Sequence, residues 1–217
     1  MLSRGFTLIE VLVTLVILLF GLLGIAGLMA KGQRASFEAF QRQEALSFAN
    51  DMAERIRANS NLNGTLPVPV STYIAGAPVA TPLGDGVAYN QLLTGAITNC
   101  ATSACDGNQM ATYDLALWDG LLNGYTESQV AGGNRVGGII SARGCVEDIG
   151  NTVAACPAAP APLGYTYNQS VRVSVAWQGN DDTVAPLGAL TCGTGLYGAE
   201  TKRRVVALDE TLIVKCP

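Results

Sequence analysis

An uncharged run of twenty residues, Val11 to Ala30, constrains this chain more than any other feature. At a helical rise of about 1.5 Å per residue the run is about 30 Å long, which matches the hydrocarbon core of a bilayer. It therefore predicts a membrane-spanning helix. One acidic residue, Glu10, stands directly before the run, and a carboxylate is costly in lipid. We therefore expect Glu10 to have a partner.

Two simpler interpretations of this segment remain open. A secretory signal peptide would use Arg4 as its positive region and end after a small residue such as Ala26, but its apolar region normally has about 7 to 15 residues. A plain signal anchor would leave Glu10 without a role. Charge alone does not decide the orientation, because Arg4 precedes the run whereas Lys31 and Arg34 follow it.

The residues around Glu10 form a motif. Gly5-Phe6-Thr7-Leu8-Ile9-Glu10, with a short basic leader before it and the apolar run after it, resembles the processing motif of type IV prepilins. The resemblance implies cleavage between Gly5 and Phe6 by prepilin peptidase on the cytoplasmic face, and N-methylation of Phe6. It also implies that Glu10 binds the new terminal amine of an adjacent subunit. Strong attraction between an ammonium and a carboxylate in a filament core of low dielectric agrees with that role.

Composition narrows the possible chemistry. The chain has 217 residues, a net charge of -4 and no histidine. The absence of histidine excludes Ser-His triads, imidazole acid-base catalysis and zinc sites that use histidine. Basic residues are dispersed apart from Lys202-Arg203-Arg204, so we expect no nucleic-acid partner. We interpret that triplet as the solvated start of a strand rather than as a binding patch.

Three groups of carboxylates are the remaining candidates for catalysis: Asp114 with Asp119, Glu147-Asp148 and Asp181-Asp182. Glycosidase-like chemistry needs two acids that face each other across a cleft, and nothing in the sequence places these groups so. Asp181-Asp182 in a glycine-rich turn is a candidate calcium site, but too few ligands are visible for the usual six or more oxygens. We interpret all three groups as exposed, solvated acids, and predict no enzyme activity, no cofactor and no metal.

Six cysteines, all beyond the apolar run, indicate disulfide bonds in an exported domain, because their number is even. Proximity in the sequence suggests the pairs Cys100–Cys105, Cys145–Cys156 and Cys192–Cys216, although six cysteines allow fifteen connectivities. A metal site is the alternative interpretation, but the spacings are not those of a CxxC motif.

The spacing of apolar residues along the chain predicts its helices and strands. Apolar residues beyond Ala30 recur at steps of three and four, which extends the helix from about Thr7 to about Ala58. Residues 62–98, rich in proline and glycine, are expected to form a long irregular connection. A capping box at Asp106 and Gln109 predicts a short helix that stops at Asn123-Gly124, with Tyr113 and Trp118 as core anchors.

Three strands are expected, around 139–145, over 165–177 and over 204–214. In the second strand, one half-buried face contains Val171, Val173, Val175 and Trp177. The third strand is apolar enough to be central or covered.

The second half of the chain extends the resemblance. The cysteine pair before Met110-Ala111-Thr112-Tyr113-Asp114-Leu115 and Trp118, then Gly144-Cys145, then the strand that ends in Val175-Ala176-Trp177, is similar to the minor pilin family PilV, the type IV pilus modification proteins. The resemblance implies an α+β pilin-like fold, in which a long amino-terminal helix packs on a small antiparallel sheet that disulfides stabilise. The expected parts are a leader (1–5), a membrane or filament-core helix (6–30), its amphipathic continuation (31–58) and a globular domain (59–217).

The same resemblance implies a function in pilus assembly. The chain is expected in the inner membrane, with its carboxyl-terminal domain in the periplasm, until it enters an extracellular type IV pilus or fimbrium. Its partners there are other minor pilins and the major pilin, which it binds through the helix. It would help to initiate assembly near the tip, in support of twitching motility and cell adhesion. A type II secretion pseudopilin and an adhesive or ligand-binding tip module are the alternatives.

Overall fold

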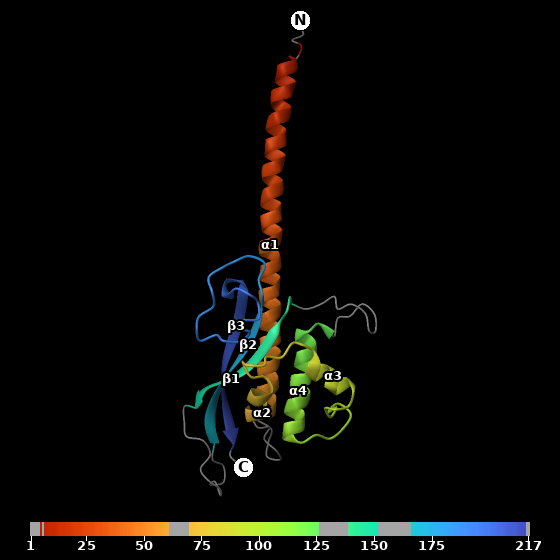
Figure 1. The fold of residues 1–217 in the computed structure, drawn as a ribbon, viewed down its shortest axis with the longest axis vertical. Helices are drawn as coiled ribbons and strands as arrows, with labels where there is room; N and C mark the ends of the chain where they lie inside the picture. Colours follow the sequence, from red (N-terminus) through yellow and green to blue (C-terminus); the bar gives the residue numbers. More distant parts are fainter. Residues whose placement is uncertain (1–4, 6, 61–69, 126–138, 152–165, 216–217) are drawn as a thin grey trace. The chain divides into compact units, whose positions relative to one another are not determined.

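Helix α1 (Leu8–Ser60) is the longest element of the chain and confirms the predicted long helix (Figure 1). The computed structural model describes residue 5 and residues 7–60, 70–125, 139–151 and 166–215. These residues belong to two compact units, Met1–Phe40 and Gln41–Pro217. Helix α1 contributes to both units, and the elements that follow it all belong to the second.

From Gln41 onward, one face of α1 lies in the core of the second unit. Ala45, Ala49, Met52, Ala53 and Ile56 are buried there. Their spacing of three and four residues places them on one stripe, and three alanines allow other elements to approach the helix closely. The predicted stripe also included two earlier aromatic residues, which are 44% and 61% exposed: Phe37 and Phe40. The stripe is therefore buried over only its second part.

Three shorter helices follow α1: α2 (Val70–Gly76), α3 (Val87–Leu93) and α4 (Gly107–Leu122). The prediction of an irregular connection over 62–98 was wrong where α2 and α3 lie, because helices of seven residues are too short to show a periodic pattern; residues 61–69 are outside the described ranges. Helix α4 is confirmed, including the predicted capping box and the stop at its end. Trp118 is fully buried, whereas Tyr113 is only half-buried and lies outside the core.

A three-stranded antiparallel sheet completes the second unit. It contains β1 (Arg143–Asn151), β2 (Thr166–Gln178) and β3 (Arg203–Lys215) in the order β1-β2-β3. The segment before α3 adds backbone hydrogen bonds to the outer edge of β1, between Leu83 and Gly144 and from the Val146 amide to the Ala77 carbonyl. The last strand was predicted to be central or covered, but β2 has the central position and β3 is an edge strand. Only part of β3 is buried, notably Val206 and Leu212.

Strand β2 is covered on both faces, not on one as its alternating pattern predicted. Val171, Val173, Val175 and Trp177 face the main core, together with the buried residues of α1 and α4. Ser174 and Ala176 point to the opposite face and are also completely buried. There, Ala176 belongs to a second small core with Cys145, Cys192 and Tyr197. The segment between β2 and β3, residues 179–202, therefore forms a cover over the back of the sheet.

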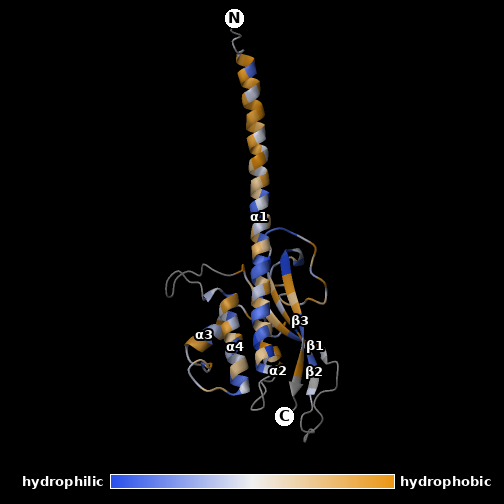
Figure 2. Cartoon of the chain, turned by 180° about the vertical axis from the view of Figure 1, so that it is seen from behind, coloured by the Kyte–Doolittle hydropathy of each residue, from blue (hydrophilic) through white to orange (hydrophobic). Residues whose placement is uncertain are grey.

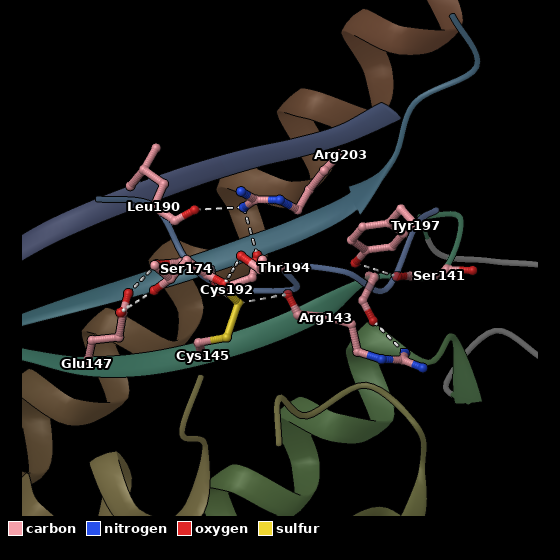
Figure 3. The surroundings of a disulfide bond; sticks show 12 residues. Ser141, Arg143, Cys145, Glu147, Ser174, Leu190, Cys192, Thr194, Tyr197 and Arg203 are labelled. Carbon is pink, nitrogen blue, oxygen red and sulfur yellow. Dashed lines mark hydrogen bonds between the residues drawn. A yellow bond between two sulfur atoms is a disulfide. The ribbon is translucent and has the colours of Figure 1, made fainter. Parts of the chain in front are cut away.

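Two disulfides are present among the described residues, Cys100–Cys105 and Cys145–Cys192, and Figure 3 shows the second. The first confirms its predicted pair. The predicted pairs Cys145–Cys156 and Cys192–Cys216 were wrong, because β1 places Cys145 directly beneath the segment that carries Cys192. Cys156 and Cys216 themselves lie outside the described residues.

Arg203 fastens the same cover from the side of β3. Its guanidinium donates through Nη1 to the carbonyl oxygens of Leu190 (2.7 Å) and Cys192 (3.0 Å), and its Nε pairs with Glu200. The side chain is only 4% exposed. The basic triplet does mark the start of a strand, as predicted, but the interpretation that it is solvated was wrong for Arg203 because carbonyls and a carboxylate satisfy it inside the fold.

The two disulfides should differ in their effect on stability. In the chain-entropy model a link stabilises more when it closes a longer loop, so a separation of 47 residues for Cys145–Cys192 corresponds to about 4 kcal/mol and one of 5 residues for Cys100–Cys105 to about 2 kcal/mol. We expect the double variant Cys145→Ala with Cys192→Ala to lower the unfolding free energy by more than Cys100→Ala with Cys105→Ala. Guanidinium unfolding of the full chain in detergent tests this, and equal losses would contradict it.

Candidate assembly site

The start of α1 presents the residues that the prepilin motif singles out. Gly5 is exposed and precedes the helix, whereas Phe6 lies outside the described residues. Thr7 begins the helix, because its carbonyl (3.1 Å) and its hydroxyl (3.4 Å) both accept from the Glu10 amide. The Glu10 carboxylate is exposed and forms no ion pair within the described part of the chain. A partner for Glu10 must therefore come from outside this set of residues.

From Val11 to Ala30 helix α1 has no charged residue, and Figure 2 shows this part mostly in the colour of hydrophobic residues. Its large apolar side chains from Leu8 to Met29 are between 41% and 84% exposed. By length and composition, α1 is the one helix in the described ranges that is suited to cross a membrane. A surface of this kind is not stable in water, so it belongs in lipid or against other helices.

Comparisons with known families agree with this geometry. Residues 1–26 match the prokaryotic N-terminal methylation motif, and residues 28–116 match the Tt1218-like family, described as type IV pilin Tt1218. Over its first 116 residues the chain is therefore similar to type IV pilins. That family is structural, and the two matches imply processing by prepilin peptidase and incorporation into a pilus. No curated protein and no solved structure matched the chain.

The second unit contains two buried carboxylates that the sequence prediction placed in solvent. Asp114 and Asp119 on α4 are 5% and 0% exposed. A pattern in the sequence pointed to the burial of Asp114, which shares the helical stripe of Ala111, Leu115 and Trp118. The prediction of exposed acids was wrong here because hydrogen bonds inside the fold replace water around both carboxylates.

Asp114 joins three helices. It accepts from the hydroxyl of Tyr73 on α2 (2.7 Å), from Nδ2 of Asn59 on α1 (2.6 Å) and from Nη1 of Arg55 on α1 (3.0 Å). Burial raises the pKa of the Tyr73 phenol far above its usual value, and the hydrogen bond to Asp114 raises it further. This network fixes α4 against the end of α1 without any contribution from the sheet.

Asp119 forms no ion pair with a described residue and accepts backbone amides instead. Its Oδ1 accepts from Gly84 (2.7 Å) and Gly86 (3.1 Å), and its Oδ2 accepts from Tyr89 (3.0 Å) in the first turn of α3. The residue before α3, Gly86, provides no side-chain cap. Asp119 therefore caps α3 from a neighbouring helix and holds the turn before it.

The other carboxylates lie closer to the surface. Asp148, Asp181 and Asp182 are exposed, as predicted, and Glu147 is half-buried, with Ser174 and Thr191 hydroxyls beside it (Figure 3). Asp182 accepts from the Thr201 hydroxyl at 2.8 Å. In the described part of the chain, no three His, Cys, Asp or Glu side chains gather in the manner of a metal site.

The Tyr73 phenol should make the domain sensitive to alkali. It stays protonated in the folded chain but ionises in the unfolded chain above about pH 10, so the unfolded state binds fewer protons there. The unfolding free energy therefore falls as pH rises above about 10, by about 1.4 kcal/mol per pH unit for this one group. We expect Tyr73→Phe to reduce that slope by this amount in urea titrations from pH 8 to 11.5.

Tryptophan fluorescence provides the signal, because Trp118 and Trp177 are both buried. Tyr113→Phe is the matched control, since Tyr113 lies on the same helix as Asp114 but makes no hydrogen bond to Asp114. It should leave the slope unchanged. An identical slope for Tyr73→Phe and the wild type would contradict the prediction.

Proposed function

We propose that this type IV pilin is a minor pilin of the PilV type that helps to initiate pilus assembly near the tip. The observation that carries the proposal is the exposed Glu10 carboxylate at the start of an entirely apolar helix, within a match to the methylation motif. The short cysteine loop before α4, and strand β2 with Val175-Ala176-Trp177 near its end, support the PilV assignment by resemblance.

The proposed maturation follows from the motif. Prepilin peptidase cleaves between Gly5 and Phe6, removes the leader (1–5) and leaves Phe6 as the amino terminus, which is then N-methylated. The new ammonium of one subunit pairs with Glu10 of its neighbour. Residues 6–30 then form the filament core, residues 31–58 continue the helix, and residues 59–217 form the outer domain. Leader removal is favoured by the position of Gly5, which is exposed and outside the helix.

The proposed location follows from the disulfides. Cys100–Cys105 and Cys145–Cys192 require an oxidising compartment, which supports a periplasmic domain anchored in the inner membrane before assembly. After extraction the chain joins other minor pilins and the major pilin through α1, in an extracellular fibre. Twitching motility and adhesion then depend on it only through the number and stability of the fibres.

Glu10→Gln should separate membrane insertion from assembly. The variant keeps the shape of the side chain but removes the charge that pairs with the neighbouring ammonium, so we expect normal amounts in the membrane fraction and at least a tenfold loss from sheared surface fibres. Immunoblots of the two fractions measure this. Thr14→Val is the matched control, because the Thr14 hydroxyl is already bonded within α1 to the Val11 carbonyl (2.9 Å).

Two outcomes would contradict the proposal. Normal amounts of Glu10→Gln in the fibres would show that the carboxylate has no role in assembly. Co-purification of the wild-type chain with secretion components, and not with sheared fibres, would favour the type II pseudopilin. Edman sequencing of the mature protein adds a direct check, since the proposal requires methylated Phe6 as its first residue.

A further inference from the structure

A cavity of about 310 Å³ lies in the second unit, where the turn before α3, the end of α4 and the start of β1 meet. Its polar lining includes Asp85, Asn123, Ser141 and Arg143, with Leu122 and Ile139 among its apolar lining. The family matches and the assembly role of α1 do not account for it. A volume at the lower end of the range for ligand sites suits one small polar molecule.

The turn that carries Asp85 is held in a single conformation. Gly84 and Gly86 on either side of it have φ of 115° and 82°, a region that favours glycine. The buried Asp119 carboxylate accepts both of their amides, and a side chain at Gly84 would collide with the Ala142 carbonyl. Asp85 itself is exposed, with one carboxylate oxygen bonded to the Val87 amide at 3.0 Å. The fold therefore presents this carboxylate on a rigid support.

The lining of the cavity also contains the one non-glycine residue of positive φ in the described ranges, Ser141, at 53°. Its carbonyl accepts from the Tyr197 hydroxyl at 3.0 Å, in the cover that the Cys145–Cys192 disulfide ties to the sheet (Figure 3). A residue keeps such a conformation only when its surroundings impose it, and these positions are frequent at functional sites. The disulfide-bonded cover thus supports one wall of the cavity.

Opposite charges line the cavity without neutralising each other. The Arg143 guanidinium donates through Nη1 to the carbonyls of Gly84 (2.6 Å) and Ala142 (2.9 Å), and it forms no ion pair with a described residue. Asp85 likewise forms none within those ranges. Guanidinium has five N–H donors, so most of them are not used by these two carbonyls. A ligand that meets both charges needs an anionic group and a hydrogen-bond donor.

We propose that this cavity binds an acidic sugar, a uronic acid unit whose carboxylate pairs with Arg143 and whose ring hydroxyls donate to Asp85 and bond to Ser141. Arginine binds carboxylates through two parallel hydrogen bonds, and an aspartate accepts from hydroxyls. A simple anion would be repelled by Asp85, and a neutral sugar would leave Arg143 without a counter-ion. The proposal does not depend on filament assembly, because all of these residues belong to the second unit.

The test uses the full chain in detergent micelles, with methyl β-glucuronide as the probe and methyl β-glucoside as the uncharged comparison. Saturation-transfer NMR and titration calorimetry measure binding. We expect the glucuronide to bind in the millimolar range, at least tenfold more tightly than the glucoside. Asp85→Asn and Arg143→Gln should each weaken glucuronide binding at least tenfold, with near-ultraviolet circular dichroism as the check that the variants are folded.

Asp148→Asn is the matched control for Asp85→Asn. Asp148 is also exposed and also accepts one local amide, from Gly150 at 3.0 Å, but it does not line the cavity. It should leave binding unchanged. The proposal is overturned if the wild type does not bind the glucuronide, if the glucoside binds as tightly, or if folded Asp85→Asn binds as the wild type does. Pili that assemble normally without sugar binding would reject this site and leave the assembly role intact.

Discussion

The apolar surface of α1 is the constraint on which the rest depends. Sixteen large apolar side chains between Leu8 and Met29 are exposed, and full burial of each contributes about 1.5 to 3 kcal/mol. Even a fraction of that sum exceeds the roughly 5 to 15 kcal/mol that stabilises a whole domain. The helix must therefore lie in lipid or among other helices. Either environment makes the Glu10 carboxylate costly, and the proposed pairing with a neighbouring ammonium would offset that cost.

In the second unit, the sheet is small and depends on a covering segment for its burial. Three strands with one face in water bury little surface, and the covering segment on the back buries the second face of β2, so that Ser174 and Ala176 are completely buried. That segment has few regular backbone partners of its own. Cys145–Cys192 and Arg203 replace them, one by a covalent link and the other by hydrogen bonds to the Leu190 and Cys192 carbonyls. The cover and the sheet are therefore one structural element.

Patterns among residues that are close in the sequence predicted the parts of the fold that depend on contacts between such residues. The length of α1, the capping box of α4 and the alternation of β2 each depend on residues that are neighbours in the sequence, and all three were predicted. Pairing of Cys145 with Cys192 depends instead on how the cover crosses the sheet, which proximity in the sequence does not reveal. The burial of Asp119 was missed for the same reason, because its partners at Gly84, Gly86 and Tyr89 precede it by thirty residues or more. The prepilin motif could be recognised in the sequence because its residues are contiguous.

The distribution of charge connects these observations. Residues 58–134 contain no lysine or arginine, so every acid in α2, α3 and α4 must find its partner elsewhere. Asp114 obtains Arg55 from α1, and Asp119 obtains three backbone amides, so both are satisfied within the fold. Asp85 obtains one amide and lines the same cavity as Arg143 of β1, the cation that the sheet contributes there. An exposed ion pair between these two residues would add little stability, whereas a ligand with an anionic group and hydroxyls, as proposed, would satisfy both charges on a rigid support.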